Sequence, residues 1–205
     1  MSPRPTTIST EHLVDVAEQV FLAQGVGAAT SEIARQAGVS EAAIFKRFST
    51  KQALFMAAMK LPEATWTSLL SRHSECPEAL KEHLVDLAQA LLSYFQEVVP
   101  RLMLLRSHPA YPDFCGAFKG RDDAPPARYL RSLTGFFEKE TAAKNIRGAE
   151  PRVMARIFLG TLYNYASFEV MGLSQETMSP SAFSTQMVET LWRAWQPESG
   201  QEDRR

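Results

Sequence analysis

The stretch TSEIARQAGVSEAAIFKRF, residues 30–48, has the pattern of two short helices joined by a tight turn. Ile33 and its apolar neighbours lie on one face of the first helix, and Gly38 supplies the positive φ angle that the turn needs at little steric cost. Ser40 is a favoured N-cap for the second helix, which turns Ile44 inward. This spacing predicts a helix-turn-helix. The inward positions are Ile33, Ala34, Ala37, Val39, Ile44 and Phe48.

The outward residues of the predicted second helix, Glu41–Phe48, define a surface for DNA. In such motifs the second helix enters the major groove with its N-terminal residues against the base edges. Ala42 and Ala43 can touch a thymine methyl group, and Glu41 can accept a hydrogen bond from cytosine N4. The pattern therefore favours sequence-specific DNA binding.

A further helix is predicted to begin directly after this motif. Ser49 and Gln52 fit a capping box, which places Lys51 in the first helical turn. The helix dipole disfavours a cation there, so an ammonium group beside free backbone N–H groups makes sense where a DNA phosphate binds. The alternative interpretation of Lys51 is a solvated surface lysine.

Apolar residues recur at helical spacing along most of the chain, whereas strand alternation and hairpin turns are nearly absent. The predicted fold class is therefore all-α. A first helix is expected to end at Gly25, with Ser9 or Thr10 as its N-cap. Later helices are expected over 51–72 with a kink at Pro62, from Pro77 to before Pro100, and over 128–143, 150–171 and 181–195, with a loop-rich connection at 106–128.

The composition excludes several classes of protein. The 205 residues are 45% apolar and 22% charged, which is typical of a globular chain long enough to bury a core. The longest apolar run, Ala53–Met59, is far shorter than the roughly 20 residues of a membrane helix, and the N-terminus lacks the apolar region of a secretory signal. We therefore expect a cytoplasmic protein. Two cysteines, Cys76 and Cys115, are too few for a disulfide framework.

Motifs of enzymes are absent from the sequence. It contains no phosphate-binding loop, dinucleotide fingerprint or nucleophile elbow, and no Glu-x-x-His pair for a di-iron site. His73 and Cys76 lie three residues apart, but two ligands do not make a zinc site. We therefore expect no enzymatic activity, no metal and no cofactor.

Residues Leu13 to Met59 resemble the DNA-binding head of the Tet repressor (TetR/AcrR) family of bacterial transcription regulators. The matching strings are LVDVAEQVFLAQG at 13–25, IARQAGVS at 33–40, IFKRF at 44–48 and KQALF at 51–55. The resemblance implies two domains. The first, 1–50, would bind DNA through the helix-turn-helix, and the second, 51–205, would be a helical bundle for ligand binding and dimerisation.

Two positions depart from the pattern of the resembled family. Phe45 stands where many relatives have a phosphate-binding tyrosine, so we expect Phe45 only to pack. Ala29 stands where relatives often have a hydroxyl residue, so Thr30 or Ser31 is expected to serve as helix cap and phosphate donor. The expected DNA-contacting set is Thr30, Ser31, Arg35, Ser40, Glu41, Ala42, Ala43, Phe45, Lys46, Arg47 and Lys51.

The resemblance also implies a ligand pocket and a dimer interface in the second domain. Aromatic residues beyond Leu61 suit a small, largely apolar ligand, although core packing is the alternative for each of them. The pocket candidates are Trp66, Leu70, Tyr94, Met103, Phe114, Phe118, Tyr129, Phe137 and Asn164. Relatives dimerise through their last two helices, which gives the interface candidates Gly160, Asn164, Phe183, Met187, Leu191, Trp192 and Trp195, with packing inside one subunit as the alternative.

Together these features predict a homodimeric repressor that a ligand releases from a palindromic operator. The two half-sites would lie about one helical turn apart (~34–36 Å) or a multiple of it. The ligand would tilt helix 51–72 and so misplace the two heads. The alternatives are an all-α interaction protein, or a ligand carrier, that keeps the head without operator binding.

The formal net charge of −1 conceals a basic segment. Residues 30–60 carry five basic and two acidic side chains. This modest excess predicts weak non-specific binding to phosphates, so affinity must come from the register of the protein on DNA and from base contacts.

Overall fold

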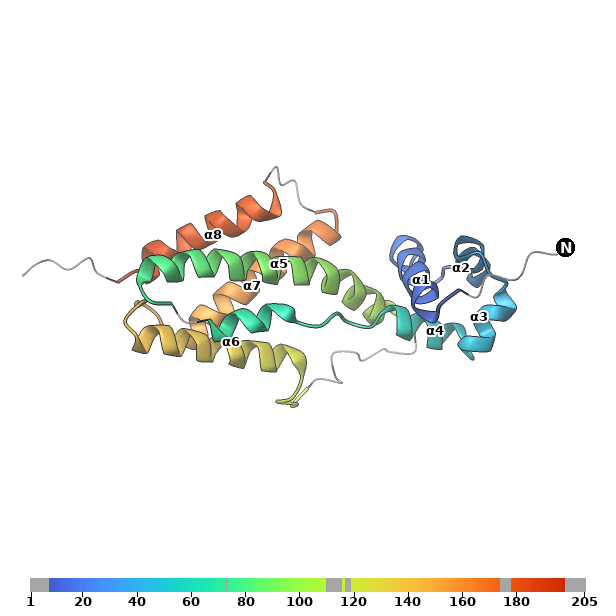
Figure 1. The fold of residues 1–205 in the computed structure, drawn as a ribbon, viewed down its shortest axis with the longest axis horizontal. Helices are drawn as coiled ribbons and strands as arrows, with labels where there is room; N and C mark the ends of the chain where they lie inside the picture. Colours follow the sequence, from blue (N-terminus) through green and yellow to red (C-terminus); the bar gives the residue numbers. More distant parts are fainter. Residues whose placement is uncertain (1–7, 73, 110–115, 117–118, 174–177, 198–205) are drawn as a thin grey trace, which may run out of the picture. The chain divides into compact units, whose positions relative to one another are not determined.

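The computed structural model describes residues 8–72, 74–109, 116, 119–173 and 178–197, and every regular element in these ranges is a helix. The all-α prediction is confirmed. The elements are α1 (Thr10–Gln24), α2 (Thr30–Ala37), α3 (Glu41–Arg47), α4 (Lys51–Ala58), the 3₁₀ helix η1 (Thr65–Ser71), α5 (Pro77–Ser107), α6 (Pro125–Ala142), α7 (Pro151–Val170) and α8 (Pro180–Trp195) (Figure 1).

The chain divides into two compact units. Unit 1 comprises Met1–Leu61 together with Pro100–Ala117, and unit 2 comprises Pro62–Val99 together with Phe118–Arg205. Helix α5 therefore contributes residues to both units. No described helix is long and apolar enough to cross a membrane.

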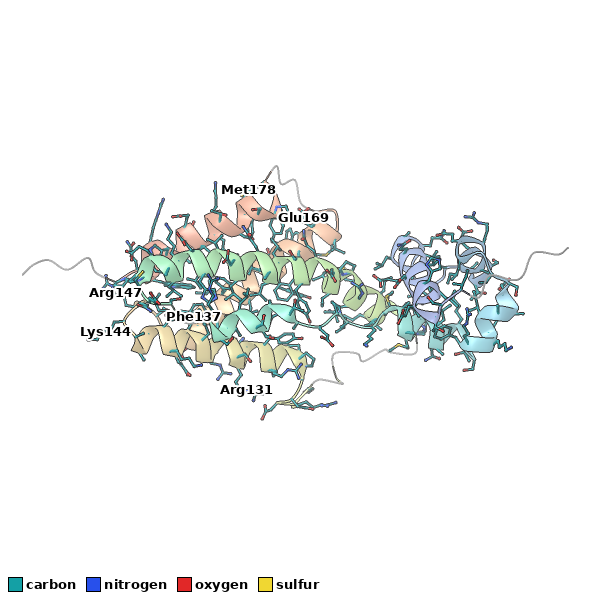
Figure 2. All side chains as sticks on the ribbon, in the orientation of Figure 1. Arg131, Phe137, Lys144, Arg147, Glu169 and Met178 are labelled. Carbon is teal, nitrogen blue, oxygen red and sulfur yellow. The ribbon has the colours of Figure 1, made fainter. Side chains whose placement is uncertain are left out.

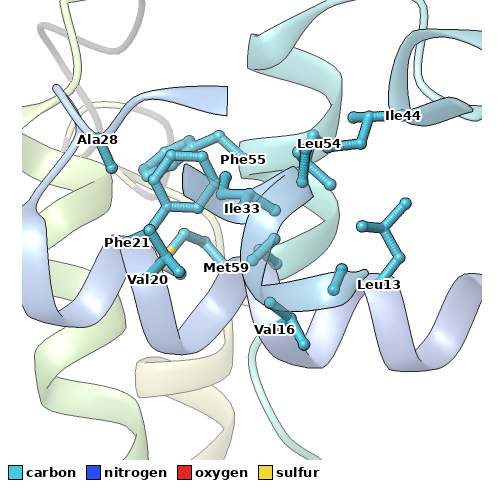
Figure 3. Packing of buried hydrophobic residues seen from close by; sticks show 14 of the residues in the cluster. Leu13, Val16, Val20, Phe21, Ala28, Ile33, Ile44, Leu54, Phe55 and Met59 are labelled. Carbon is cyan, nitrogen blue, oxygen red and sulfur yellow. The ribbon is translucent and has the colours of Figure 1, made fainter. Parts of the chain in front are cut away.

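Unit 1 is built on one core shared by α1, α2, α3 and α4. Phe21 of α1 meets Phe55 of α4 edge to face, with 5.1 Å between the ring centroids (Figure 3). Ile33 of α2 and Ile44 of α3 are fully buried in the same cluster. Burial of each such side chain contributes about 1.5–3 kcal/mol, so the core holds the short helix α3 against its neighbours.

The end of α5 completes the core of unit 1. Pro100 lies inside α5, and the helix continues beyond it to Ser107. The prediction that this helix stops before Pro100 is therefore wrong. A proline in a helix interior costs about 3 kcal/mol. Burial of Val99 in unit 2 and of Leu105 in the core of unit 1 offsets that cost on the two sides of the proline.

Polar and aromatic contacts also tie this part of α5, and His108 directly after it, to the rest of unit 1. The Arg101 guanidinium forms an ion pair with the carboxylate of Glu18 on α1. The ring of His108 stacks on Phe55 with 4.8 Å between the centroids. The last part of α5, from Pro100 to Ser107, is therefore part of unit 1.

Helix α4 is short, and the long helix predicted over 51–72 is not present. The helix gives way at Met59 to an irregular segment that runs through Pro62 to η1. A residue before proline is disfavoured in the helical region, and proline offers no N–H for the helix ladder. Because α4 has already ended at Ala58, no helix passes through Pro62, and the expected kink is not present.

Unit 2 is a bundle formed by η1, the first part of α5, and α6, α7 and α8. Phe137 of α6 is fully buried, and its ring lies 6.0 Å from that of Phe158 and 5.4 Å from that of Trp195, centroid to centroid. Figure 2 shows Phe137 inside the bundle, with Arg131 and Lys144 on its outside. This aromatic cluster joins α6, α7 and α8.

The connection between α6 and α7 packs against the C-terminal end of α8. The backbone N–H of Arg147 donates to the carbonyl of Trp195 at 2.8 Å. Gly148 has φ +99°, and a Cβ at this position would lie 2.5 Å from the carbonyl oxygen of Ala194. The close approach of two backbones therefore requires glycine at 148.

Candidate nucleic-acid interface

The turn between α2 and α3 has the geometry predicted from the sequence. Gly38 adopts the left-handed conformation with φ 67°, and the N–H of Val39 donates to the carbonyl of Ala34 at 3.0 Å. Ser40 caps α3 by accepting a hydrogen bond from the Ala43 N–H at 3.2 Å. The predicted helix-turn-helix is present, with α3 as its second helix.

Helix α3 buries one face and exposes the other. Ile44 is fully buried, and Ala43 is half-buried. Phe45 is 42% exposed, so its ring is available for a packing contact outside the core of unit 1. The exposed residues of α3 are Glu41, Ala42, Phe45, Lys46 and Arg47, which form the face opposite the core.

A side-chain hydrogen bond links the starts of α2 and α3. The Oγ1 hydroxyl of Thr30 donates to Oε2 of Glu41 at 2.6 Å. The N-cap position of α2 is Ala29, which supplies no capping side chain. The expectation that Thr30 or Ser31 caps α2 is therefore wrong, because the helix begins at Thr30 and the Thr30 hydroxyl is used on Glu41. Ser31 is exposed.

Two arginines of the predicted set have partners within unit 1. Arg35 binds Glu32 through two hydrogen bonds of 2.8 and 2.6 Å. The Arg35 guanidinium, helped by the Gln36 amide, lowers the pKa of the Glu32 carboxyl to about 2. Arg47 donates to the backbone carbonyl of Ile8 at 2.5 Å. These contacts hold both guanidinium groups near the protein surface.

Two lysines of the predicted set lie on α3 and at the start of α4. Lys46 is exposed, and Lys51 is the half-exposed first residue of α4. The N-cap of α4 is Thr50, whose Oγ1 accepts from the Ala53 N–H at 3.0 Å. The capping box predicted at Ser49 is therefore wrong by one residue. Lys51 nevertheless lies in the first helical turn, as expected.

The pocket candidates do not form one group. Trp66, Tyr94 and Tyr129 lie together in unit 2, with 5.2 Å between the rings of Trp66 and Tyr129 and 3.0 Å between the two tyrosine hydroxyls. Burial, followed by the hydrogen bond between the Tyr94 and Tyr129 hydroxyls, raises the pKa of Tyr94. Leu70 is half-buried on η1. Three further candidates lie apart from this group: Phe137 is in the separate aromatic cluster, Met103 is in unit 1, and Asn164 is exposed on α7. The candidates Phe114 and Phe118 lie outside the described residues, as does Cys115.

The dimer candidates on α8 are largely covered by their own chain. Met187, Trp192 and Trp195 are at most 8% exposed, whereas Phe183 and Leu191 are half-buried. The indole of Trp195 packs on Phe137, and its burial leaves almost no surface for a second copy. Gly160 and Asn164 on α7 are both exposed.

Sequence reasoning named Gly160 and Asn164 of α7 as dimer candidates, but it missed the large apolar residues beside them on the outer face of this helix. This face carries large apolar side chains that are 39–47% exposed, on the opposite side of the helix from its buried residues. The signal was a second apolar stripe in the same helix, at intervals of three and four residues. The α7 stripe consists of Val153, Ile157, Gly160, Asn164, Phe168 and Met171.

A folded helix-turn-helix with an exposed second helix, joined to a separate helical bundle, defines the class of DNA-binding transcription regulators. Residues 13–58 match the family model described as bacterial regulatory proteins, tetR family. The chain therefore carries the helix-turn-helix head of the tetR family, and the recognition from its motifs is confirmed. Regulators of this family bind DNA and are not enzymes. A search of curated proteins found no match.

Solved structures of regulators share the fold over nearly the whole chain. A TetR-like transcriptional regulator from Rhodococcus sp. RHA1 is 18% identical, with a TM-score of 0.60 and coverage of 94% of this chain and 97% of that one. The regulator FadR from Bacillus subtilis, solved with stearoyl-CoA, is 19% identical, with a TM-score of 0.60 and coverage of 89% and 97%. NalD, the secondary repressor of the MexAB-OprM multidrug efflux pump in Pseudomonas aeruginosa, is 19% identical, with a TM-score of 0.56 and coverage of 92% and 96%. At these identities the likeness shows the fold.

Proposed function

We propose that the protein is a cytoplasmic, homodimeric repressor that binds a palindromic operator and is released by a small, largely apolar ligand. The observation that carries this proposal is the outer face of α3, which exposes Ala42, Phe45 and Lys46 while Ile44 is locked in the core. In this proposal residues 1–50 bind DNA, and residues 51–205 bind the ligand and dimerise.

DNA binding is tested by gel retardation at two salt concentrations. Lys46 and Lys51 are expected to bind phosphates, so Lys46→Ala and Lys51→Ala should each lower the slope of log affinity against log salt by about one. Lys60→Ala is the matched control, because Lys60 is an exposed lysine of unit 1 beyond the end of α4. The slope of this variant is expected to equal that of the wild type.

Selection of bound duplexes from random DNA tests the operator itself. A palindromic pair of half-sites is expected among the recovered duplexes. Absent binding, or binding that does not respond to salt, would instead favour an interaction protein or a ligand carrier. A reporter gene placed behind the recovered operator then tests repression, since a repressor lowers its transcription.

Dimerisation is proposed to use the α7 stripe, which would meet the stripe of a second copy. Regulators of this family act as dimers, and the α7 stripe is an apolar helix face that its own unit leaves exposed. A two-fold interface of this kind places the same residues of both copies against each other. Ile157→Asp is therefore expected to give a monomer in analytical ultracentrifugation.

The control for this test is Leu22→Asp. Leu22 is a similarly exposed apolar residue, 37% exposed against 39% for Ile157, but it lies on α1 of unit 1. A dimeric Leu22→Asp with a monomeric Ile157→Asp supports the proposal. Two dimeric variants would contradict the use of the α7 stripe.

The ligand is proposed to contact the aromatic group of Trp66, Tyr94 and Tyr129. Trp66 is 1% exposed, and its indole Nε1 has no hydrogen-bond partner among the described residues. A buried donor without a partner is costly, so a ligand that offers an acceptor oxygen would gain a hydrogen bond there. We expect uncharged aromatic or acyl compounds to release the operator in the wild type and to act more weakly on Trp66→Phe. Stearoyl-CoA, which FadR holds, is a charged acyl compound to include for comparison.

The ligand is proposed to release the protein from DNA through α5, since this helix supplies residues to both units. This proposal takes the place of the tilting helix expected over 51–72, because α4 ends at Ala58. A compound that releases DNA is expected to change the distance between spin labels on the two heads of a dimer. An unchanged distance would contradict release by movement of the heads.

A further inference from the structure

The outer face of α3 combines apolar surface with an exposed lysine. Ala42, Phe45 and Lys46 are spaced i, i+3 and i+4, so they lie on one face, and all three are exposed. Among the described residues of unit 1, Leu22 and Phe45 are the large apolar side chains that are more than a third exposed. A single exposed apolar side chain is common on protein surfaces, but Phe45 lies on the helix face that is proposed to meet the edges of the bases.

Two of the three polar side chains of α3 that can discriminate G·C pairs, Glu41 and Arg47, are held by atoms of unit 1, whereas Lys46 is exposed. The Glu41 carboxylate, which can accept from cytosine, already accepts the Thr30 hydroxyl at 2.6 Å. The Arg47 guanidinium, which can bind guanine, donates to the Ile8 carbonyl at 2.5 Å. The surface left for base contacts is therefore the apolar pair Ala42 and Phe45, with Lys46 beside it.

The major groove offers one apolar group to such a surface, the C5-methyl group of thymine. Resting on the proposed operator binding, we propose that α3 recognises thymines in each half-site through their methyl groups, with Phe45 as the main contact and Ala42 beside it. Phe45 is then a specificity-determining residue. The absence of a phenolic hydroxyl suits this role, because an apolar ring loses no hydrogen bond against a methyl group.

The proposed contact is tested by removing or replacing the C5-methyl group of a single thymine in the DNA. Duplexes recovered by selection from random DNA are resynthesised with deoxyuridine at one half-site thymine at a time, and their affinity is compared with that of the parent duplex. A methyl group in contact with Phe45 is expected to contribute about fourfold in affinity, so deoxyuridine should weaken binding by about that factor. 5-Bromodeoxyuridine at the same position should restore binding, since bromine fills the volume of the methyl group.

Protein variants assign the effect to Phe45. In Phe45→Ala the affinity ratio between thymine and deoxyuridine duplexes should fall from about four to about one, as in a double-mutant cycle between contacting groups. Leu22→Ala is the control, and it should keep the wild-type ratio because Leu22 lies on α1. Recovery of no duplex by the wild type would overturn operator binding and this inference together. Binding that ignores deoxyuridine at every thymine, or a ratio that Phe45→Ala leaves unchanged, would overturn the inference alone.

Discussion

Helices α3 and α7 each bury one face in their own unit and expose apolar side chains on the other. In α3, seven residues long, Ile44 is the one buried residue, and the outer face mixes Phe45 with charged groups. In α7, twenty residues long, seven residues are buried, and the opposite face carries a mostly apolar stripe that Asn164 interrupts. Helix α3 is therefore held in unit 1 through one buried side chain, whereas α7 is held in unit 2 by seven buried residues along its length.

This difference indicates different partners. An outer face with a lysine and isolated apolar groups suits DNA, whose major groove is polar apart from the thymine methyl groups. A longer, mostly apolar face suits a protein surface of the same kind, because apolar surface gains most from burial against other apolar surface. The two faces therefore fit one protein that binds DNA and pairs with a second copy.

Loss of the aromatic cluster in unit 2 is expected to have the largest effect. Phe137→Ala leaves a cavity beside Phe158 and Trp195, so we expect the free energy of unfolding to fall by about 3–5 kcal/mol. Urea denaturation followed by circular dichroism measures this change. Leu22→Ala, which truncates an exposed side chain, should change it by less than about 0.5 kcal/mol. Equal losses in both variants would show that Phe137 does not hold unit 2 together.

A negative charge on the outer face of α3 should act on DNA binding and not on folding. Ala42→Glu places a carboxylate against DNA, so operator affinity should fall at least about 100-fold, or about 2.7 kcal/mol. Ala23→Glu is the matched control, because Ala23 is an exposed alanine on α1. Gel retardation and a thermal melt of both variants test this. Similar operator affinities would place the DNA-reading surface elsewhere than on α3.

The sequence alone was sufficient to predict the helix-turn-helix, because its signals are local. Gly38, the Ser40 cap and the inward Ile44 each act within a few residues of the chain. The helix that runs through Pro100 could not be predicted in this way. Its stability comes from Leu105 packing on residues about 50 or more positions earlier in the chain, which no local pattern contains. For the same reason, the hydrogen bonds of Glu41 and Arg47 could not be predicted, because their partners Thr30 and Ile8 lie in other segments of the chain.

Burial of His83 should make the free energy of unfolding of unit 2 depend on pH. His83 of α5 is 2% exposed, with its ring edge to face with Phe136 at 5.4 Å. Burial, and then the positive charge of Arg72, lower the pKa of His83, whereas Glu140 on α6 and Asp86 on α5 raise it less. Below a pH of about 6.5 the unfolded chain binds a proton that the folded chain does not bind. The free energy of unfolding should therefore fall as the pH drops, by at most about 1.4 kcal/mol per pH unit from this group.

Urea denaturation between pH 7.5 and 5 measures this dependence. His83→Gln keeps a polar side chain at the site but removes the titration, so its dependence on pH should be shallower than that of the wild type. Identical dependence in both proteins would assign the effect to other groups. This test concerns unit 2 alone, because His83 lies within Pro62–Val99.

The smallest expected effect is a rise in the free energy of unfolding when Gly160 of α7 is replaced by alanine. A Cβ at Gly160 would meet no atom within 4 Å in the described chain, so Gly160→Ala should raise the free energy of unfolding by about 0.5–1 kcal/mol through helix propensity. If the α7 stripe pairs with a second copy, the same methyl group enters the interface and changes the dimer dissociation constant. Gly135→Ala on α6, where a Cβ also meets nothing within 4 Å, should stabilise the fold without that change. An identical dimer constant in both variants would remove Gly160 from the interface.

The return of α5 into unit 1 has a consequence for protein synthesis. A ribosome finishes α1 to α4 about 45 residues before it reaches Leu105, which amounts to several seconds at ~5–20 residues per second. Throughout that interval the nascent helix-turn-helix lacks the apolar cover of Leu105 and the ion pair from Arg101 to Glu18. A translation product that stops before Pro100 therefore carries an incomplete core in unit 1, and its helix-turn-helix is expected to be less stable than that of the full chain.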